Sequence, residues 1–184
     1  MNQELYEKFC HEYEKKGLWE HSTHGSKLKN CAEKYGERIA LIDEQEEISY
    51  QELDLRSDQM AAWMLHEGFV KGERIVIQHV NCIGFAVMCF AMFKIGVIPV
   101  LAMPSHGMRE LSGIVKTAQP KGFIVIETYH GVDHLAEAAV LQKENPCIEK
   151  VIPAGSLMRS FMRSPAAGIL RSLCFLEALQ ESRS

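Results

Sequence analysis

The chain has 184 residues, which is enough for one domain with a hydrophobic core and too few for two large domains. Its hydrophobic content of 47% and charged content of 24% are typical of a soluble globular protein. A net charge of −4 argues against nucleic acid as a partner, because binding to phosphates requires a basic surface. The six cysteines include no Cys-x-x-Cys pair, and Cys82 and Cys89 lie in an apolar run, which indicates reduced thiols and a cytoplasmic location.

The first part of the chain is predicted to form helices around a pair of strands. A charged N-terminal helix and a second short helix precede two candidate strands, Ile39–Ile42 and Glu47–Tyr50, joined by an acidic turn. Ser49 lies three residues before Glu52, the spacing of a capping box in which each side chain bonds the other residue's backbone amide. Apolar residues at helical spacing then predict a helix over Gln51–Glu67 that ends at a glycine.

Strands and helices alternate along the rest of the chain. The predicted strands are Arg74–Gln78, Ile98–Met103, Gly122–Glu127 and Lys150–Ile152, and the predicted helices are Ile83–Ile95, Met108–Thr117 and Val132–Lys143. This alternation predicts an α/β fold with a mainly parallel sheet flanked by helices, because parallel strands need helical crossovers. The segments "FKIGVIPVLAM" and "GFIVIE" are apolar without alternation, which indicates strands covered on both faces.

Residues 82–104 form the longest apolar stretch and contain a single charged residue, Lys94. Their number would allow a membrane-spanning helix. Gly96 and Pro99 divide the stretch into a helix and a strand of ordinary length for a globular core, so no membrane span is predicted. The charged N-terminal segment also differs from a secretory signal, which again favours the cytoplasm.

Residues 156–184 differ in composition from the residues before them. They contain four arginines, no lysine and two glutamates, so they are net positive whereas residues 1–155 are net negative. The sequence therefore predicts an α/β domain over residues 1–155 and a divergent tail over residues 156–184. One candidate helix in this tail has apolar residues on or near one face: Ile169, Leu170, Leu173, Leu176, Ala178 and Leu179.

Few residues form a pattern that indicates catalysis or metal binding. His21 and His24, and likewise His130 and His134, have spacings that a zinc site can use, but no third ligand has a defined spacing, so loop or surface histidines are predicted. The sequence has neither a glycine-rich phosphate loop nor a Gly-x-Ser-x-Gly nucleophile motif. Carboxylates cluster in surface segments such as "DEQEE", so no catalytic residue and no metal ligand are predicted.

Two polar residues follow predicted parallel strands. Asn81 lies in a polar loop after Arg74–Gln78, and His106, in "MPSHG", follows Ile98–Met103. Open α/β sheets bind ligands at the edge formed by the carboxyl ends of their strands. His106 and Asn81 are therefore the candidate substrate-binding residues, with a structural role in the loop as the alternative for His106.

The order of several motifs resembles that of the adenylate-forming enzymes. "SYQEL" resembles the first core motif of that superfamily, and "FKIGVIPVLAMP" resembles the second. "YEKKGLWE", "RIVIQHVN" and "PVLAMPSH" are most similar to the 2,3-dihydroxybenzoate–AMP ligases of siderophore biosynthesis. The resemblance covers about residues 5–155. It departs at His79 and Val80, where Leu-Pro is usual, and at Gly107, where related ligases often carry arginine.

The resemblance implies that the chain is the first α/β subdomain of the ligase fold and that this fold is incomplete. Full-length members use ATP and Mg²⁺ to convert a carboxylic acid, here a small aromatic acid, into an acyl-adenylate, and then pass the acyl group to a carrier-protein or coenzyme A thiol. The phosphate loop and the catalytic lysine of the family have no counterpart in this sequence. The chain is therefore expected to bind no cofactor and to be inactive alone, and its tail is interpreted as the product of a frameshifted or prematurely ended gene.

Two alternatives stay open. The chain could be a non-catalytic interaction module that binds a partner through its C-terminal helix. A separately encoded second half could also complete the enzyme. In each case, a parallel sheet without its usual neighbouring elements exposes an edge, and self-association through that edge is expected.

Overall fold

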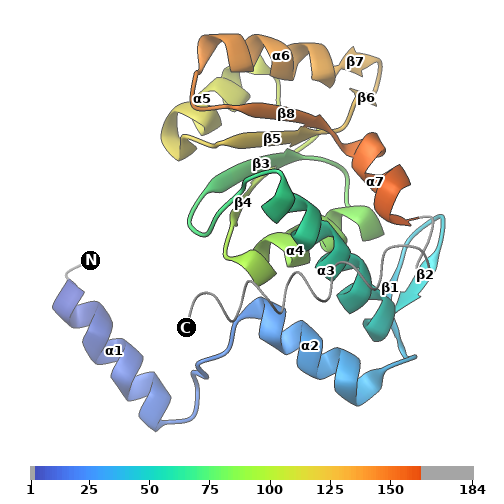
Figure 1. Ribbon diagram of the computed structural model, residues 1–184. Helices are drawn as coiled ribbons and strands as arrows, with labels where there is room; N and C mark the ends of the chain where they lie inside the picture. The colour runs from blue at the N-terminus through green and yellow to red at the C-terminus, as the bar shows by residue number, and fades with distance from the viewer. Residues whose placement is uncertain (1–2, 163–184) are drawn as a thin grey trace.

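The computed structural model describes residues 3–162, with a four-stranded sheet at the centre. The strand order is β4-β3-β5-β8, and every neighbouring pair is parallel. The strands are β3 (Arg74–Gln78), β4 (Ile98–Ala102), β5 (Gly122–Val125) and β8 (Lys150–Pro153). Helices α3 (Tyr50–His66), α4 (Ile83–Ile95) and α7 (Ala154–Met162) cover one face, and α5 (Met108–Ala118) and α6 (His134–Glu144) cover the other (Figure 1). The predicted α/β fold with a parallel sheet is confirmed.

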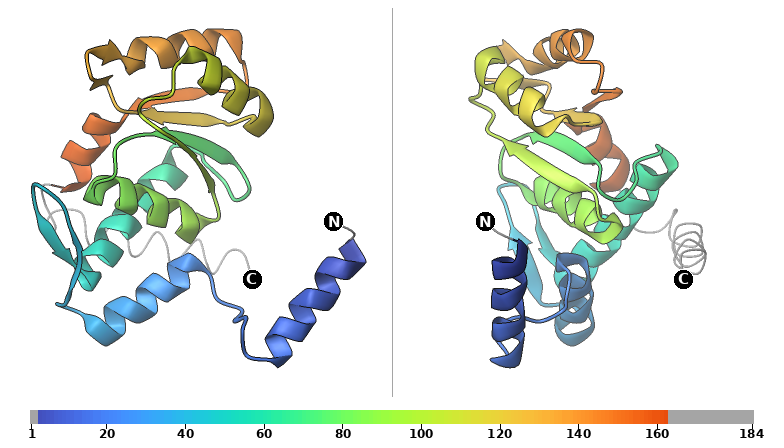
Figure 2. Two further views of the ribbon diagram at one scale, coloured as in Figure 1. Left: turned by 180° about the vertical axis from the view of Figure 1, so that it is seen from behind. Right: turned by 90° about the vertical axis from the view of Figure 1, so that its left-hand side faces the viewer.

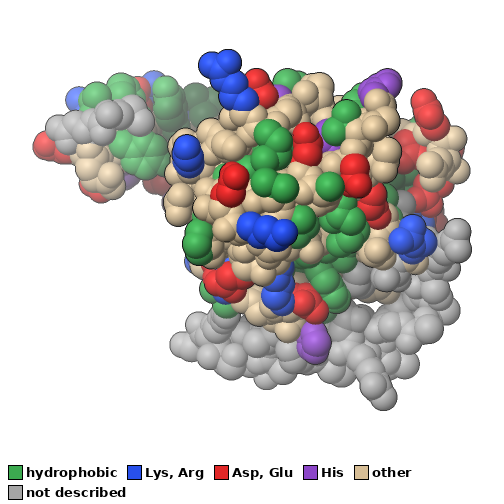
Figure 3. All heavy atoms as spheres, turned by 90° about the horizontal axis from the view of Figure 1, so that it is seen from above, with side chains coloured by type: hydrophobic (Ala, Val, Ile, Leu, Met, Phe, Trp, Pro, Cys, Tyr) green, Lys and Arg blue, Asp and Glu red, His purple; other side chains and the backbone are tan. Residues whose placement is uncertain are grey.

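The sheet separates two hydrophobic cores. Ile75 and Ile77 of β3 belong to the core under α3 and α4, whereas Val76 between them belongs to the core under α5 and α6, and all three are fully buried. Because strand side chains alternate between the two faces, a strand that is covered on both faces needs no polar side. This explains the apolar strand sequences. The outer surface over α5 and α6 mixes charged side chains of both signs with apolar ones (Figure 3).

An antiparallel hairpin leads into α3. After α2 (His24–Tyr35), the hairpin consists of β1 (Ile39–Ile42) and β2 (Glu47–Ser49). Half of the predicted capping box is present, because the Ser49 hydroxyl accepts a hydrogen bond of 3.1 Å from the Glu52 amide. The Glu52 carboxylate does not return this bond but pairs with Arg56. Arg56 also donates bonds of 2.8 and 2.9 Å to the Glu46 carboxylate, which connects α3 to the hairpin turn.

The single charge in the apolar stretch, Lys94, is explained by its partners on α3. Its ammonium group lies 2.6 Å from carboxylate oxygens of both Asp54 and Asp58, and it also bonds the Asp54 backbone carbonyl at 2.9 Å. These contacts satisfy a half-buried cation and hold α4 against α3. Gly96 ends α4 in the left-handed conformation, so the stretch divides into helix and strand as predicted. Within residues 3–162, no helix is long and apolar enough to cross a membrane.

The structure differs from the prediction between β5 and α6. β6 (Thr128–Tyr129) and β7 (Val132–Asp133) form a short hairpin where the sequence predicted a strand to Glu127 and a helix from Val132. The two residues at its turn, His130 and Gly131, have φ angles of 47° and 81°. These left-handed conformations reverse the chain, and α6 begins only after the hairpin. The prediction was wrong here because the turn contains a histidine where glycine or asparagine is usual.

Both edge strands of the sheet carry a proline where a backbone amide would otherwise face outward. In β4 the Ile98 amide bonds toward β3, so the next residue, Pro99, faces away from the sheet. In β8 the Lys150 amide bonds toward β5, which places Pro153 on the outer side. Proline has no N–H to donate and so limits pairing with a further strand. Self-association through the sheet edge stays a prediction, and these prolines weaken it.

Helix α7 runs across the predicted boundary between residues 155 and 156. Leu157 is only 5% exposed, and Met158 packs against the same core. Residues just beyond the predicted boundary therefore contribute to the packed domain. The candidate amphipathic helix of the tail, with its apolar residues at positions 169–179, lies outside the described residues, and the nature of the tail stays a prediction.

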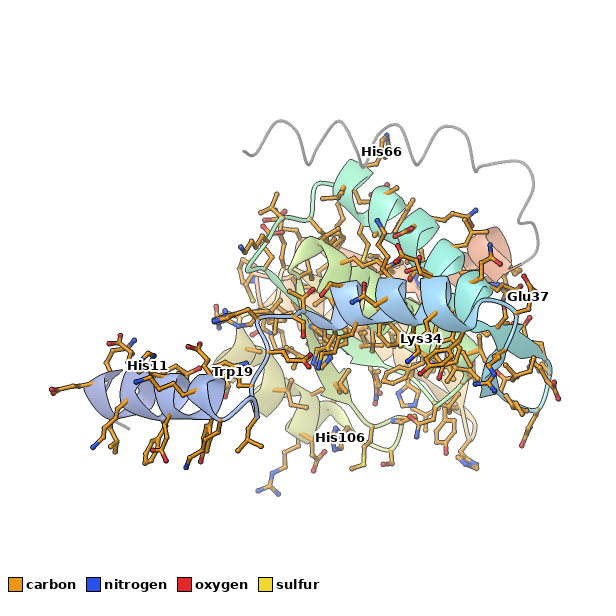
Figure 4. The ribbon with its side chains drawn as sticks, turned by 90° about the horizontal axis from the view of Figure 1, so that it is seen from below. His11, Trp19, Lys34, Glu37, His66 and His106 are labelled. Carbon is orange, nitrogen blue, oxygen red and sulfur yellow. The ribbon has the colours of Figure 1, made fainter. Side chains whose placement is uncertain are left out.

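Helix α1 (Gln3–Lys15) stands apart from the rest of the fold (Figures 1 and 2). None of its residues is buried, and Leu5, Phe9 and Tyr13 are 42–45% exposed. The segment that joins it to α2 contains Trp19, which is also exposed (Figure 4). A helix of this length gains little stability in water without tertiary packing.

Candidate functional site

A pocket lies at the carboxyl ends of β3 and β4, beside the point where the order in which strands join the sheet reverses. The chain passes from β3 through α4 to β4 on one face, then through α5 to β5 on the other side of β3. Such a switch point is where open α/β sheets bind ligands. The pocket has a volume of about 520 Å³ and is lined by His79, Val80, Asn81, Phe85, Leu101, Ala102, Met103, Pro104, Ser105 and Tyr129.

His79, directly after β3, is the most deeply placed polar residue of this pocket. Its side chain is only 8% exposed. Its Nδ1 lies 2.9 Å from the Val80 carbonyl oxygen and 3.7 Å from the Cys82 sulfur. Burial lowers the pKa of His79, because the charged imidazolium is disfavoured away from water, and hydrogen bonding to Val80 and the nearby Glu127 carboxylate oppose this only in part. The sequence reasoning noted His79 only as a departure from a family pattern and missed it as a site residue.

Asn81, one of the two predicted site residues, does line the pocket. It lies in the loop between β3 and α4, and its side chain is exposed at the rim. The prediction rested on its position after a parallel strand, and that position does bring it to the sheet's carboxyl edge. Whether Asn81 contacts a substrate stays a proposal.

His106, the other predicted residue, is not among the residues that line the pocket. Its Nδ1 accepts a bond of 3.3 Å from the Met103 amide, and its backbone carbonyl accepts one of 3.0 Å from the buried Gln78 side chain. The ring therefore stabilises the loop after β4, which forms part of the pocket wall. Figure 4 shows His106 beside α5, on the side of the molecule opposite His66.

Tyr129 contributes to the pocket from β6 and was not predicted. Its ring makes an edge contact with His130, with centroids 4.2 Å apart, and a tilted contact with His134 at 6.5 Å. The hairpin that carries Tyr129 was missed at the sequence level, so no signal was available for this residue. His134 itself is buried and bonds Glu137 through Nδ1 at 2.9 Å.

The histidine pairs considered for zinc are not assembled into a metal site. His21 contacts Glu14, and His24 makes a tilted ring contact with Phe93, so the two rings have different surroundings. In the part of the chain that the structure describes, no three histidine, cysteine or acidic side chains are grouped to hold a metal ion.

Carboxylates of the chain occupy two helix N-termini close to the sheet's carboxyl edge. The Asp43 side chain accepts a bond of 2.9 Å from the Ile83 amide at the start of α4. The Glu127 side chain accepts one of 3.1 Å from the Gly155 amide at the start of α7. A helix N-terminus attracts anions through its free amides and its dipole. Here carboxylates of the protein itself occupy these two helix starts. The hydrogen bond from the Ile83 amide lowers the pKa of Asp43.

Comparison with known proteins assigns the chain to a family. Residues 28–163 match the family model described as "AMP-binding enzyme". The chain belongs to the AMP-binding enzyme family. This confirms the resemblance to adenylate-forming enzymes, and the matched range includes the pocket, the sheet and all of α7.

Individual relatives of this AMP-binding chain have names that refer to aromatic acids. It is 36% identical over 143 residues to the 2,3-dihydroxybenzoate-AMP ligase of Bacillus subtilis and 31% identical over 148 residues to the salicyl-AMP ligase / salicyl-S-ArCP synthetase of Mycobacterium tuberculosis. Each alignment covers 78% of this chain and 26% of the relative. The chain thus spans about a quarter of the length of the curated relatives it matches.

The fold of the AMP-binding chain also matches solved structures. The apo structure of Mycobacterium smegmatis MbtA superposes with a TM-score of 0.74 and 25% identity, and the match covers 82% of this chain and 29% of that one. The structure of VinN gives a TM-score of 0.67 at 23% identity, which shows a common fold alone. The described residues therefore have the architecture of part of a larger AMP-binding enzyme.

Proposed function

We propose that the chain is the N-terminal part of a cytoplasmic ATP-dependent ligase that adenylates an aryl acid of the 2,3-dihydroxybenzoate kind, for siderophore biosynthesis. The names of the two relatives above, which specify 2,3-dihydroxybenzoate and salicyl groups, support this substrate class. In the full-length enzyme, ATP and Mg²⁺ would activate the acid, and a carrier-protein or coenzyme A thiol would accept the acyl group. The described residues would serve as a scaffold and would form one wall of the binding site for the acid.

We further propose that the chain does not adenylate an acid by itself. One observation carries this: among the described residues, the pocket at the sheet's carboxyl edge has no basic side chain to offer a triphosphate. None of the pocket-lining residues is lysine or arginine, and one amide at the start of α4 and one at the start of α7 are bonded to Asp43 and Glu127. Charge that develops on phosphate during transfer needs cations or free amides to stabilise it.

The test is ATP–pyrophosphate exchange with 2,3-dihydroxybenzoate. The purified chain alone is expected to give no exchange above a no-enzyme control. Adding the remaining three-quarters of the Bacillus subtilis relative as a separate polypeptide is expected to give exchange that depends on both pieces. Exchange by the chain alone would contradict the proposed inactivity. A reconstituted pair that exchanges with other carboxylic acids but not with aryl acids would contradict the substrate class.

Within this function, Asn81 would contact the acid at the pocket rim, and His106 would act by holding the loop after β4. In the reconstituted pair, Asn81→Ala is expected to raise KM for the acid several-fold, by loss of one hydrogen bond. His106→Ala is expected to reduce thermal stability as well, because the Met103 amide loses its acceptor. If both variants change KM equally with no change in stability, the two residues do not have these separate roles.

One observation favours the alternative of a non-catalytic interaction module. The apolar side of α1 has no cover in the described part of the chain, and a partner could provide it. The predicted C-terminal helix would be a second contact. A pull-down that compares the whole chain with versions lacking residues 1–17 or 167–184 tests this, and retention of every partner by both truncated versions would count against it.

A further inference from the structure

Helix α1 presents an apolar stripe that no described residue buries. Leu5, Phe9 and Tyr13 follow one another at intervals of four residues and are 42–45% exposed. The Phe9 and Tyr13 rings stack, with centroids 6.3 Å apart and 19° between their planes, so they form one continuous apolar surface. Figures 1 and 2 show α1 apart from the sheet and from the helices that cover it. Within residues 3–162, the stripe therefore lacks the cover that a helix of 13 residues needs for stability in water.

The charges on α1 indicate what kind of partner can cover the stripe. The helix contains four glutamates and two lysines: Glu4, Glu7, Glu12, Glu14, Lys8 and Lys15. It is therefore net negative, whereas a helix that binds an anionic membrane or nucleic acid needs a basic polar face. A protein surface with an apolar stripe and charges of both signs is a better match, and a second α1 is such a surface.

The spacing of the stripe fits a second copy of itself in the antiparallel direction. Phe9 is the middle residue of Gln3–Lys15, and Leu5 and Tyr13 lie four residues to either side of it. A two-fold axis at Phe9 places Phe9 against Phe9 of the second copy and Leu5 against Tyr13 of the second copy. Such an isologous contact uses the same surface on both copies, so every side chain of the stripe meets an apolar partner.

The charges beside the stripe favour the antiparallel direction over the parallel one. Lys8 and Glu12 lie one turn apart on one flank of the stripe; Lys8 is exposed, and the Glu12 side chain is 45% exposed. In the antiparallel pair, Lys8 of each copy comes beside Glu12 of the other, so the favourable contact occurs twice. In a parallel pair, Lys8 would meet Lys8 and Glu12 would meet Glu12, which is unfavourable.

We propose that α1 binds α1 of a second copy of this chain, antiparallel, through Leu5, Phe9 and Tyr13. The contact is small, because a few side chains from each copy bury less than the total of about 1,000 Å² expected of a stable interface. The dimer is therefore weak, with a Kd on the order of 10 μM. The proposal does not depend on the proposed function, since none of these residues lines the pocket.

The experiment is sedimentation velocity of the whole 184-residue chain from about 1 to 100 μM, with a reducing agent that prevents disulfides. The unaltered chain is expected to shift from monomer to dimer over this range. Phe9→Glu, at the centre of the stripe, is expected to stay monomeric and to unfold at the same temperature as the unaltered chain at about 1 μM, because no residue of α1 is buried. The matched control is Val140→Glu, which changes an equally exposed apolar side chain on α6 and is expected to dimerise normally.

Charge reversal tests the direction of pairing. Lys8→Glu and Glu12→Lys are each expected to weaken dimerisation about tenfold, because two Lys–Glu contacts become like-charge contacts. Mixing the two variants is expected to restore dimerisation, because each then supplies the charge that the other lacks. Unchanged dimerisation of both charge variants would overturn the proposal, since a parallel pair is insensitive to these changes. A monomer at every concentration, dimerisation of Phe9→Glu, or loss of dimerisation in Val140→Glu would overturn it as well.

Discussion

The sheet and the helix α1 show two opposite relations between sequence pattern and packing. Both contain apolar residues at regular spacing, but Phe123 on β5 is fully buried whereas Phe9 on α1 is 42% exposed. The sheet side chains meet partners from helices distant in the chain, whereas within residues 3–162 α1 meets none that bury it. An apolar pattern therefore indicates a surface that needs cover, and only the tertiary structure shows whether that cover is present.

The largest expected effect comes from removing a buried ring from the sheet. Phe123→Ala is expected to lower the free energy of unfolding by about 3–5 kcal/mol, because it leaves a cavity between the sheet, α5 and α6. Phe9→Ala in α1 is the matched control and is expected to change it by less than about 0.5 kcal/mol. Urea denaturation measures both, and equal losses would mean that α1 is packed in solution.

A second expected effect concerns the ion pairs between α3 and α4. Lys94→Met keeps the aliphatic stem but leaves Asp54 and Asp58 without their cation, which is expected to cost about 2–4 kcal/mol. Burial already raises the pKa of Asp58, and Lys94 opposes that rise. Without Lys94 the pKa of Asp58 rises further, so the loss is expected to be largest at neutral pH and to shrink in acid, where the carboxyl becomes neutral. A loss independent of pH would show that packing, not charge, is responsible.

Glu127 offers a smaller test of how α7 is held to the sheet. Glu127→Ala removes the acceptor of the Gly155 amide and is expected to cost about 1 kcal/mol. Glu127→Gln is expected to cost less, because the amide oxygen still accepts a hydrogen bond. Thermal unfolding of the two variants measures the difference. If Glu127→Ala has no effect, α7 does not depend on this contact.

The smallest expected effect is the acid sensitivity due to His79. Because burial lowers its pKa in the folded chain, the unfolded chain binds the proton at higher pH, and acid favours unfolding. This contribution is absent above the ordinary pKa of about 6.5 and grows as the pH falls below it. Of the charged groups near the ring, the Glu127 carboxylate opposes the shift, and the Cys82 thiol stays neutral because burial raises its pKa.

Unfolding of His79→Phe at several pH values measures this contribution. As the pH falls from about 7 to about 5, the wild-type chain is expected to lose up to about 1 kcal/mol of unfolding free energy relative to the variant. A constant difference over this range would mean that His79 keeps an ordinary pKa in the folded chain.

Much of the fold was predictable because its signals are local. Ser49 caps α3 and Gly96 ends α4 through bonds within a few residues, and the apolar periodicity gave the order of strands and helices. The missed hairpin at His130 depended on a left-handed turn that its residue type does not favour. In the candidate site, both predicted residues follow parallel strands. Asn81 lines the pocket, whereas His106 lies only in the loop that supports the pocket wall.

The sequence by itself determined that this is a parallel α/β domain of the AMP-binding family. Apolar periodicity and helix caps depend on residues that are close in the sequence, and the family motifs depend on their order along it. Only the tertiary structure decided which partners these residues meet. Lys94 bonds carboxylates 36 and 40 residues earlier, and Tyr129 joins a pocket with residues from β4 and α4. The burial of His79 also follows from such contacts, since exposure depends on distant segments and not on neighbours in the sequence.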